Sequence, residues 1–463
     1  MAYVTINPFS GKTEAEFPET TDQEVELALQ SAQEAFEAWR ERPVDERVQV
    51  LARAARLLRE RSADYAHLIT LEMGKLAREA QAEIALSARI IDYYVTHAER
   101  LLAPQPLPVT DPKQGKPVLY QEPLGVLLAI EPWNFPFYQI ARILAPQLAV
   151  GNTIVLKHAA NVPQCALAFE KLMEDAGAPE GVYQNLFATR EQLQTIIEDP
   201  RIQGVALTGS ERAGSAVAAM AGKALKKSTL ELGGSDAFIV LDDAPLEKTV
   251  AWAVKGRHTN AGQVCSASKR LVIADCLYDR FVEAYAKAVS ELKAGDPEQA
   301  DTTLAPLSSQ EALDRLEQQV SEAVAHGAKV TALGPDVPQQ GFFAQPRLLE
   351  NVTPDNPAYQ WEFFGPVTQL YRAHDDEDAL RIANDSPFGL GGSVFSADTE
   401  RAQRVAKRFS TGMVHINHPT VTHADLPFGG VRRSGYGREL TDLGLKEFVN
   451  FKLINEVDID ADI

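Results

Sequence analysis

The sequence predicts an α/β protein in which two successive regions each build a parallel sheet, and three observations support this fold class. The chain has 463 residues, roughly two to three times the length of a typical domain, so more than one core is expected. Short apolar runs alternate with amphipathic helical patterns between residues 152 and 232, as in a buried parallel sheet. The same alternation resumes between residues 237 and 333. Gly233 and Gly234 mark the expected boundary between the two regions.

Composition and charge exclude several classes of protein. Hydrophobic residues make up 45% and charged residues 24% of the chain, which is ordinary for a folded globular protein. With 45 basic and 64 acidic residues the formal net charge is −19, which disfavours nucleic acid and membrane surfaces as partners. Three cysteines are too few for a disulfide framework, which suits a reducing cytoplasm. No secretory signal or apolar membrane span is recognised, so a cytoplasmic location is expected.

The first hundred residues carry apolar side chains spaced three and four apart, which indicates amphipathic helices. The predicted helices are 22–39, 44–61 and 76–101. Thr21 or Asp22 is expected to cap the first of them and Asp45 the second. Residues 103–117 contain five prolines and are interpreted as a connector, because proline fits neither a helix interior nor a central strand. This connector is expected to lead into a strand pair at 118–122 and 125–130.

The alternating regions define the remaining expected elements. The predicted strands are 152–157, 182–187, 204–208, 228–232, 237–240, 270–274 and 329–333. The predicted helices are 163–176, 191–198, 214–225, 246–254, 278–292 and 313–326. Residues 334–345, rich in Gly, Pro and Gln, are expected to form a surface loop. The runs 118–130 and 445–454 are expected to be strands that add to a neighbouring subunit's sheet, giving a homodimer or homotetramer.

Three local patterns contain chemically useful side chains. They are Glu-Leu-Gly-Gly at 231–234, Gly-Gln-Val-Cys at 262–265 and Glu-Pro-Trp-Asn-Phe-Pro at 131–136. Cys165, on an apolar helix face, and Cys276, after a strand, are interpreted as small buried hydrophobic residues. Cys265 differs because its neighbours are polar or flexible, so its sulfur need not fill a core.

Together with four further segments, these patterns resemble the aldehyde dehydrogenase superfamily, and most of all its succinate-semialdehyde dehydrogenases. The seven segments, in the family's order over essentially the whole chain, are EPWNFPF, VLKHAANVP, ALTGSERAG, LELGGSD, NAGQVCSASKR, EFFGPV and LPFGGVRRSGYGRE. The resemblance implies two Rossmann-like parallel-sheet domains and a β oligomerisation arm. It places a nucleotide-binding domain at 1–117 and 127–232, a catalytic domain at 233–425, and the arm at 118–126 and 445–463.

The resemblance implies that Cys265 attacks an aldehyde carbon, that hydride leaves for a nicotinamide, and that water hydrolyses the resulting thioester. Only the thiolate is reactive, and an unperturbed thiol with a pKa of ~8.5 is a few per cent ionised at neutral pH. Asn134, held between Pro132 and Pro136, and the Cys265 N–H are expected to stabilise the oxyanion. Glu231 is expected to be the general base, with a pKa raised by partial burial. The alternative for Glu231 is an exposed carboxylate at a strand end.

The cofactor implied by the resemblance is NADP⁺ or NAD⁺, although the G-x-G-x-x-G fingerprint is absent. Gly209 and Gly214 bracket a strand-to-helix turn where helix N–H groups and Ser210 would face the diphosphate. The other cofactor-binding residues implied by the family are Trp133, Lys157, Ala160, Leu232, Glu362 and Phe364. Many relatives have glutamate at the Ala160 position, where it would contact the ribose hydroxyls. Alanine there removes repulsion toward a 2′-phosphate that Lys157 can pair with, so NADP⁺ should be accepted.

The substrate is expected to carry a carboxylate. Arg142 lies eight residues after Asn134 in an otherwise nearly apolar run, and the semialdehyde-oxidising relatives direct an arginine from this position at the substrate's far carboxylate. Thr422 lies where those relatives have a hydroxyl residue on the opposite wall. The alternative for Arg142 is a surface arginine. Succinate semialdehyde is therefore the expected substrate.

Several other functions remain open at this point. Another short aliphatic or ω-carboxy aldehyde, such as glutarate semialdehyde, could be the substrate. A non-catalytic scaffold would not need Cys265, Glu231, Asn134 and Lys157, and a phosphate-activated acyl reductase would not need Glu231. His415, His418 and His423 lie close together in sequence, but no Cys or acidic cluster completes a ligand set, so no metal is expected.

Overall fold

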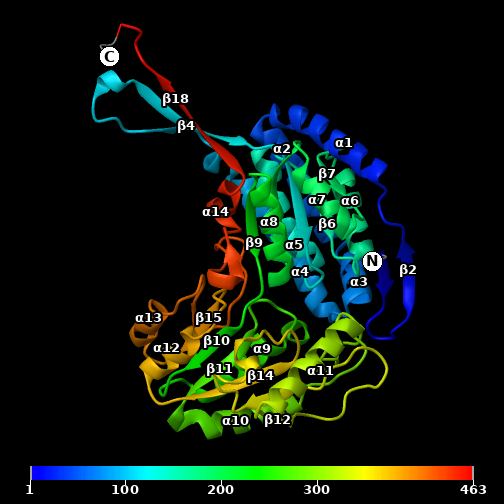
Figure 1. Ribbon diagram of the computed structural model, residues 1–463, viewed down its shortest axis with the longest axis vertical. Coiled ribbons are helices and arrows are strands. Elements are labelled where there is room, and N and C mark those ends of the chain that lie inside the picture. The colour runs from blue at the N-terminus through cyan, green and yellow to red at the C-terminus, as the bar shows by residue number, and fades with distance from the viewer. Residues whose placement is uncertain (1–2, 461–463) are drawn as a thin grey trace.

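The computed structural model describes residues 3–460 (Figure 1), which form two large sheets with covering helices and a projecting arm. The first sheet and the N-terminal helices occupy the upper part of Figure 1, and the second sheet the lower part. A short hairpin, β1 (Tyr3–Ile6) and β2 (Thr13–Phe17), precedes the first helix. No helix among the described residues is long and apolar enough to cross a membrane.

Four helices follow the hairpin, the first packed on one face of the first sheet and the other three on the side of its opposite face. They are α1 (Asp22–Arg40), α2 (Val44–Glu60), α3 (Ser62–Met73) and α4 (Ala77–Leu101). Thr21 caps α1 in a capping box with Glu24, which confirms one of the two predicted caps. The expectation for Asp45 is wrong, because Pro43 occupies the N-cap of α2 and Asp45 lies in its first turn. The prediction missed α3, which starts directly after α2 ends.

The first sheet has six strands in the order β17-β9-β8-β5-β6-β7, and all but β17 are parallel. The strands are β5 (Val126–Glu131), β6 (Thr153–His158), β7 (Tyr183–Asn185), β8 (Ile202–Thr208), β9 (Lys227–Glu231) and β17 (Gly435–Tyr436). The helices are α5 (Pro136–Val150), α6 (Pro163–Asp175), α7 (Arg190–Glu198) and α8 (Glu211–Lys223). Because the strand order reverses between β5 and β8, the carboxyl ends of these two strands border the crevice where such sheets bind ligands.

The second sheet has seven strands in the order β12-β13-β14-β11-β10-β15-β16, with only β12 antiparallel to its neighbour. The strands are β10 (Asp236–Val240), β11 (Ser268–Ala274), β12 (Lys329–Ala332), β13 (Arg347–Glu350), β14 (Val367–Ala373), β15 (Gly392–Phe395) and β16 (His415–Ile416). The helices are α9 (Leu246–His258), α10 (Asp275–Ser290), α11 (Gln310–Ala325), α12 (Asp376–Asn384) and α13 (Thr399–Ala406). The strands and helices predicted in both alternating regions are confirmed, with shifted ends.

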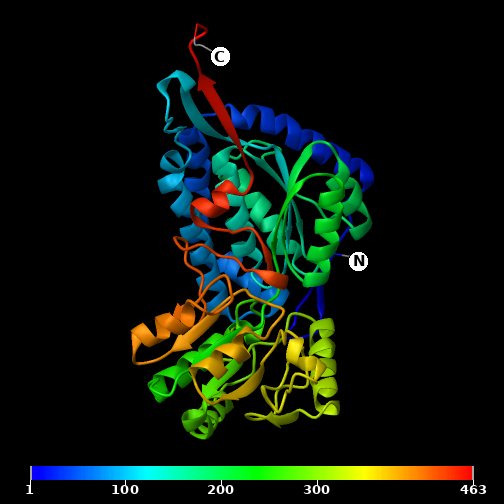
Figure 2. The same ribbon diagram turned by 60° about the vertical axis from the view of Figure 1, so that its left-hand side comes forward.

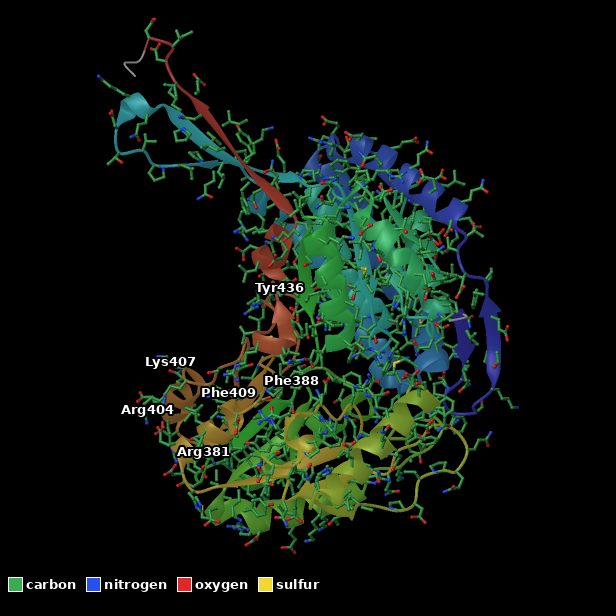
Figure 3. The ribbon with its side chains drawn as sticks, viewed as in Figure 1. Arg381, Phe388, Arg404, Lys407, Phe409 and Tyr436 are labelled. Atoms are coloured by element: carbon green, nitrogen blue, oxygen red, sulfur yellow. The ribbon has the colours of Figure 1, made fainter. Side chains whose placement is uncertain are left out.

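After the second sheet the chain returns to the first. Tyr436 in β17 lies on this return segment (Figure 3), where its hydroxyl bonds the Ser228 hydroxyl of β9 at 2.7 Å. Four 3₁₀ turns, η1 (Pro112–Gln114), η2 (Thr259–Gly262), η3 (Pro357–Gln360) and η4 (Arg432–Ser434), complete the connections. The turn η2 ends three residues before Cys265.

The arm is a three-stranded antiparallel sheet that extends away from the first sheet (Figure 2). Its strands are β3 (Gln105–Pro106), β4 (Lys116–Pro123) and β18 (Val449–Glu456), and α14 (Thr441–Lys446) precedes the last. The predicted pairing of 118–122 with 125–130 is wrong. β4 pairs with β18, whereas the almost fully buried β5 lies inside the first sheet, because Gly125 with φ 146° lets the chain leave the arm. The strand predicted at 445–454 begins only at Val449.

Two glycines of α8 offer a test of how tightly this helix packs. A Cβ on Gly214 would lie 2.5 Å from the Leu232 side chain, whereas a Cβ on Gly222 would meet nothing within 4 Å. Gly222→Ala should therefore raise the free energy of unfolding by about 0.5–1 kcal/mol, and Gly214→Ala should lower it by about 1–3 kcal/mol. Thermal unfolding midpoints measure both. Equal shifts of the two variants would contradict the close contact of α8 with Leu232.

Candidate active site

The predicted catalytic residues meet at the junction of the two sheets. Here the carboxyl ends of β5, β8 and β9, which carry Glu131, Thr208 and Glu231, face the loop that follows η2 and carries Cys265. The chain passes from one sheet to the other at Gly234, where a Cβ would lie 2.7 Å from the Cys265 carbonyl oxygen. The Glu-Leu-Gly-Gly pattern therefore brings the ends of β9 and of the cysteine loop into contact.

Cys265 lies in a loop with unusual backbone conformation. Asn260 and Ala261 have φ of 53° and 51°, in the left-handed region. Lys269 fixes the far end of the loop by donating to the Val264 and Cys265 carbonyl oxygens at 2.8 and 2.6 Å. A left-handed conformation at Ala261, four residues before Cys265, persists only where the surrounding structure holds the loop in place, and such positions cluster at functional sites.

The thiol of Cys265 is not the unperturbed group expected from the sequence. Burial raises its pKa to about 11, although the charges of Lys269 and Arg142 act in the opposite direction. At this pKa the thiolate fraction at neutral pH lies far below the few per cent expected for an unperturbed thiol, because the surrounding residues partly bury Cys265. The thiolate must be stabilised by a ligand or by transfer of its proton to a base.

Asn134 is anchored to the cysteine loop. Its Nδ2 donates to the Gln263 carbonyl oxygen at 3.1 Å, and the residue is 4% exposed. An amide nitrogen has two hydrogens, so one bond to Gln263 leaves the second for a ligand. This arrangement is compatible with the predicted oxyanion role.

Glu231 is buried at the end of β9, which excludes the alternative of an exposed carboxylate. The residue is 3% exposed, and neither carboxyl oxygen has a hydrogen-bond partner among the described residues. Burial raises its pKa to about 7, while the charges of Arg142 and Arg438 act to lower it. A carboxyl group that titrates near neutral pH and has free oxygens can exchange a proton with a nearby water.

Glu131, which the sequence analysis did not single out as a functional residue, is a second buried carboxyl group at the junction. Burial raises its pKa, the Arg142 charge opposes this effect, and the charge of Glu231 adds to it. In the sequence, the only feature that could have pointed to Glu131 was its place at the carboxyl end of a buried strand. Two buried carboxyl groups with raised pKa values, Glu131 and Glu231, therefore lie at this junction.

Arg142 is 1% exposed, so the alternative of a surface arginine is excluded. The guanidinium forms an ion pair with Glu439 and donates to the Tyr138 hydroxyl at 2.8 Å and to Thr208 Oγ1 at 3.1 Å. The Tyr138 hydroxyl also lies 3.2 Å from Thr422 Oγ1, which links the two predicted substrate-binding residues. Glu439 and Tyr138 were missed, although Tyr138 lies one helical turn before Arg142 and so shares its helix face.

The residues expected at the nicotinamide end also come together. The rings of Trp133 and Phe364 pack edge to face with centroids 5.8 Å apart. Glu362 accepts from Lys269 at 2.9 Å and from the Gly234 N–H at 3.1 Å. Its carboxylate is therefore fixed beside the cysteine loop.

Lys157 and Ala160 lie at the other end of the expected cofactor site. Lys157 Nζ donates to the His158 carbonyl oxygen at 3.1 Å and lies 5.4 Å from the Tyr3 ring centroid. Burial lowers the pKa of Lys157 to about 8, and the charge of Arg190 lowers it further. The Ala160 carbonyl oxygen accepts from the Val4 N–H at 3.0 Å. An anion placed beside Lys157 would stabilise its charged form.

The turn after β8 differs in detail from the prediction. The helix begins at Glu211 rather than at Gly214, and Ser210 is its N-cap, accepting from the Ala213 N–H at 3.3 Å. Gly214 lies inside α8 and allows close contact with Leu232, so it does not border the turn. The Gly209 N–H is bonded to the Glu231 carbonyl oxygen at 2.9 Å. The Ser210 hydroxyl hydrogen and the first amides of α8 are the remaining donors for a phosphate.

The described residues contain no group of three or more His, Cys, Asp or Glu side chains placed to hold a metal ion. His415 and His418 are neighbours, with ring centroids 6.5 Å apart.

Comparison with known proteins agrees with this geometry. Residues 1–454 match the model of the aldehyde dehydrogenase family. A succinate-semialdehyde dehydrogenase [NADP(+)] from Deinococcus radiodurans is 51% identical over 452 residues, which cover 98% of this chain and 94% of the relative. An Escherichia coli succinate semialdehyde dehydrogenase [NAD(P)+] is 42% identical over 97% of each chain. The crystal structure of succinic semialdehyde dehydrogenase from Streptococcus pyogenes in complex with NADP⁺ superposes with a TM-score of 0.96, at 44% identity over 99% of this chain and 100% of that one.

The raised thiol pKa can be tested in the ligand-free protein. The rate of Cys265 alkylation by iodoacetamide should rise about tenfold per pH unit from pH 7 to 10, because the thiolate fraction grows by that factor below the pKa. A Lys269→Met variant should react more slowly at each pH, since Lys269 lowers the pKa of Cys265. Cys165 is buried as expected, but the expectation of burial is wrong for Cys276, which is exposed at the start of α10. Peptide mass spectrometry measures the rates, and exposed Cys276 serves as the internal control. A rate that levels off near pH 8 would contradict the desolvated thiol.

Proposed function

The chain belongs to the aldehyde dehydrogenase family, and from this premise we propose that it oxidises succinate semialdehyde to succinate with NADP⁺. The observation that carries the proposal is the fully buried Arg142, whose partner Tyr138 also contacts Thr422. A buried guanidinium beside two hydroxyl groups is suited to a carboxylate at the far end of a short aldehyde. The names of the similar proteins support the same substrate class.

In the proposed reaction Cys265 Sγ adds to the aldehyde carbon. The free Nδ2 hydrogen of Asn134 and the Cys265 N–H stabilise the developing oxyanion, and each such donor contributes roughly 2.7–4 kcal/mol to lowering the barrier. NADP⁺, when bound, supplies the acceptor for the hydride. Glu231 then takes a proton from the water that hydrolyses the thioester, which its pKa of about 7 allows.

The residues present fit a dinucleotide with a 2′-phosphate. Lys157 is a partly buried ammonium whose pKa is lowered by loss of solvation and by another cation, Arg190, so an anion is the partner that would relieve both effects. Ala160 presents no carboxylate toward it. Trp133 and Phe364 would contact the nicotinamide, Glu362 its ribose, and Ser210 and the start of α8 the diphosphate. Gly209 and Leu232 shape the same crevice.

Other functions fit less well. Glutarate semialdehyde would present the same carboxylate to Arg142 and is the alternative substrate. A non-catalytic scaffold would not need a buried base beside a strained cysteine loop. A phosphate-activated acyl reductase would not need Glu231.

We also propose that the protein is a cytoplasmic homodimer or homotetramer. The β18 side chains Phe451, Leu453 and Ile454 are 49–57% exposed, which is unusual for large apolar residues. A strand on an exposed sheet edge readily pairs with a second copy of the chain. The three free cysteines suit a reducing compartment.

Glu231→Gln should separate the two halves of the reaction. The variant should release a burst of about one NADPH per active site and then stop, because the thioester forms but is not hydrolysed. Turnover of the parent should rise with pH through about 7, since Glu231 acts in its ionised form. Stopped-flow NADPH absorbance measures both. Loss of the burst itself would show that Glu231 activates Cys265 instead.

Ala160→Glu should change the cofactor preference. The new carboxylate would repel the 2′-phosphate of NADP⁺ and accept hydrogen bonds from the ribose hydroxyls of NAD⁺. The ratio of kcat/KM for the two cofactors should therefore shift toward NAD⁺. An unchanged ratio would place the adenosine ribose elsewhere.

Arg142→Leu should reduce selectivity for the ω-carboxylate. The ratio of kcat/KM for succinate semialdehyde to that for butanal should fall about ten- to a hundredfold. This factor corresponds to the loss of a charge-assisted hydrogen bond that contributes about 1.5–3 kcal/mol. Some loss of kcat/KM is expected with both substrates, because Arg142 also lowers the pKa of Glu231. Butanal has no carboxylate and therefore controls for this common loss.

Removing Arg142 alone leaves Glu439 buried without its cation, which can unfold the site. The double variant Arg142→Leu/Glu439→Gln removes both charges and should show the same fall in the ratio. An unchanged ratio in a folded double variant would remove the argument for an ω-carboxy substrate and leave an aldehyde dehydrogenase with another substrate.

A further inference from the structure

Lys75 is a completely buried lysine that contacts the main chain of the Asn134 loop. It lies between α3 and α4, and its side chain is 0% exposed. Its Nζ forms an ion pair with Glu83, donates to the Asn134 carbonyl oxygen at 2.8 Å, and lies 3.6 Å from the Phe135 ring centroid. A buried ion pair is usually no more stable than the hydrophobic residues that could replace it. Stability alone therefore does not account for Lys75.

The partner carboxylate holds the next part of the same segment. Glu83 Oε1 accepts from the Phe137 and Tyr138 N–H groups at 2.8 and 3.1 Å, which are in the first turn of α5. The Lys75–Glu83 pair thus bonds the main chain from residue 134 to residue 138. Asn134 and Tyr138, at the two ends of this segment, both belong to the proposed site.

A second donor reaches the same carbonyl oxygen from the cysteine loop. Asn260 Nδ2 donates to the Asn134 carbonyl oxygen at 3.1 Å and to the Gln263 carbonyl oxygen at 3.2 Å. The Gln263 oxygen also accepts the Asn134 side-chain amide. Asn134 is therefore fixed at its main chain by Lys75 and Asn260 and at its side chain by Gln263, two residues before Cys265.

We propose that Lys75, paired with Glu83, is a positioning residue that sets the place and direction of the free Asn134 amide hydrogen over the Cys265 sulfur. The proposal rests on the function proposed above. An oxyanion donor is effective only within a few tenths of an ångström of its required position, and a small misplacement can cost up to about a hundredfold in rate. Lys75 itself touches neither substrate nor cofactor.

The test is the single-turnover rate of NADPH formation with succinate semialdehyde in Lys75→Met. The variant should form NADPH about ten- to a hundredfold more slowly, with KM for the aldehyde changed less than about threefold, because Asn134 acts in the tetrahedral state and not in ground-state binding. If Lys75→Met does not fold, the double variant Lys75→Met/Glu83→Gln, which removes both charges, is measured in its place.

Glu72→Gln is the matched control. It alters another fully buried carboxylate, which binds the Gln164 and Cys165 N–H groups, and it should leave the rate unchanged.

A double-mutant cycle with Asn134→Ala distinguishes positioning from general damage. If Lys75 acts through Asn134, adding Lys75→Met to Asn134→Ala should change the rate less than about threefold. Additive losses, or an unchanged rate in the single variant, would overturn the proposal. Full activity of Cys265→Ala would instead refute the proposed function, so the two failures are separable.

Discussion

The buried guanidinium of Arg142 joins four separate segments, and the arrangement of the site depends on it. It contacts Tyr138 on α5, Thr208 at the end of β8, Glu439 after β17, and the Phe428 ring at 4.8 Å. Breaking a buried ion pair typically costs about 3–5 kcal/mol, because the remaining charge has no partner and little solvent. The return segment that carries Glu439 must therefore dock on the first sheet before the site is complete.

The same burial determines which groups can exchange protons. Poor solvation raises the pKa of the Cys265 thiol to about 11 and that of Glu231 to about 7, and it lowers the pKa of Lys157 to about 8. Each shift favours the neutral form of the group, because the ligand-free site solvates charged side chains poorly. Arg142 opposes the shifts of both Cys265 and Glu231. One cation thus acts on both the proposed nucleophile and the proposed base, so a substitution of Arg142 should change the pH dependence of both proposed half-reactions.

The sequence predicted the two alternating regions because apolar periodicity reports strands buried between helices. It could not show that β5 leaves β4 and enters the first sheet, since only tertiary contacts distinguish the two pairings. The motifs located Cys265, Glu231 and Asn134, whose types and neighbours carry chemical information. Glu439 was missed because its partner is nearly 300 residues away in sequence. The desolvation of Cys265 was also missed, since polar neighbours in sequence do not report burial in space.

The central claim is that Cys265 forms a covalent acyl intermediate at this junction. Acid quenching of the Glu231→Gln protein during reaction with succinate semialdehyde and NADP⁺, followed by peptide mass spectrometry, tests it most directly. The account predicts one succinyl group, and only on the peptide that contains Cys265. An acyl group on the peptides of Cys165 or Cys276, or NADPH formation with no acylated peptide, would contradict it.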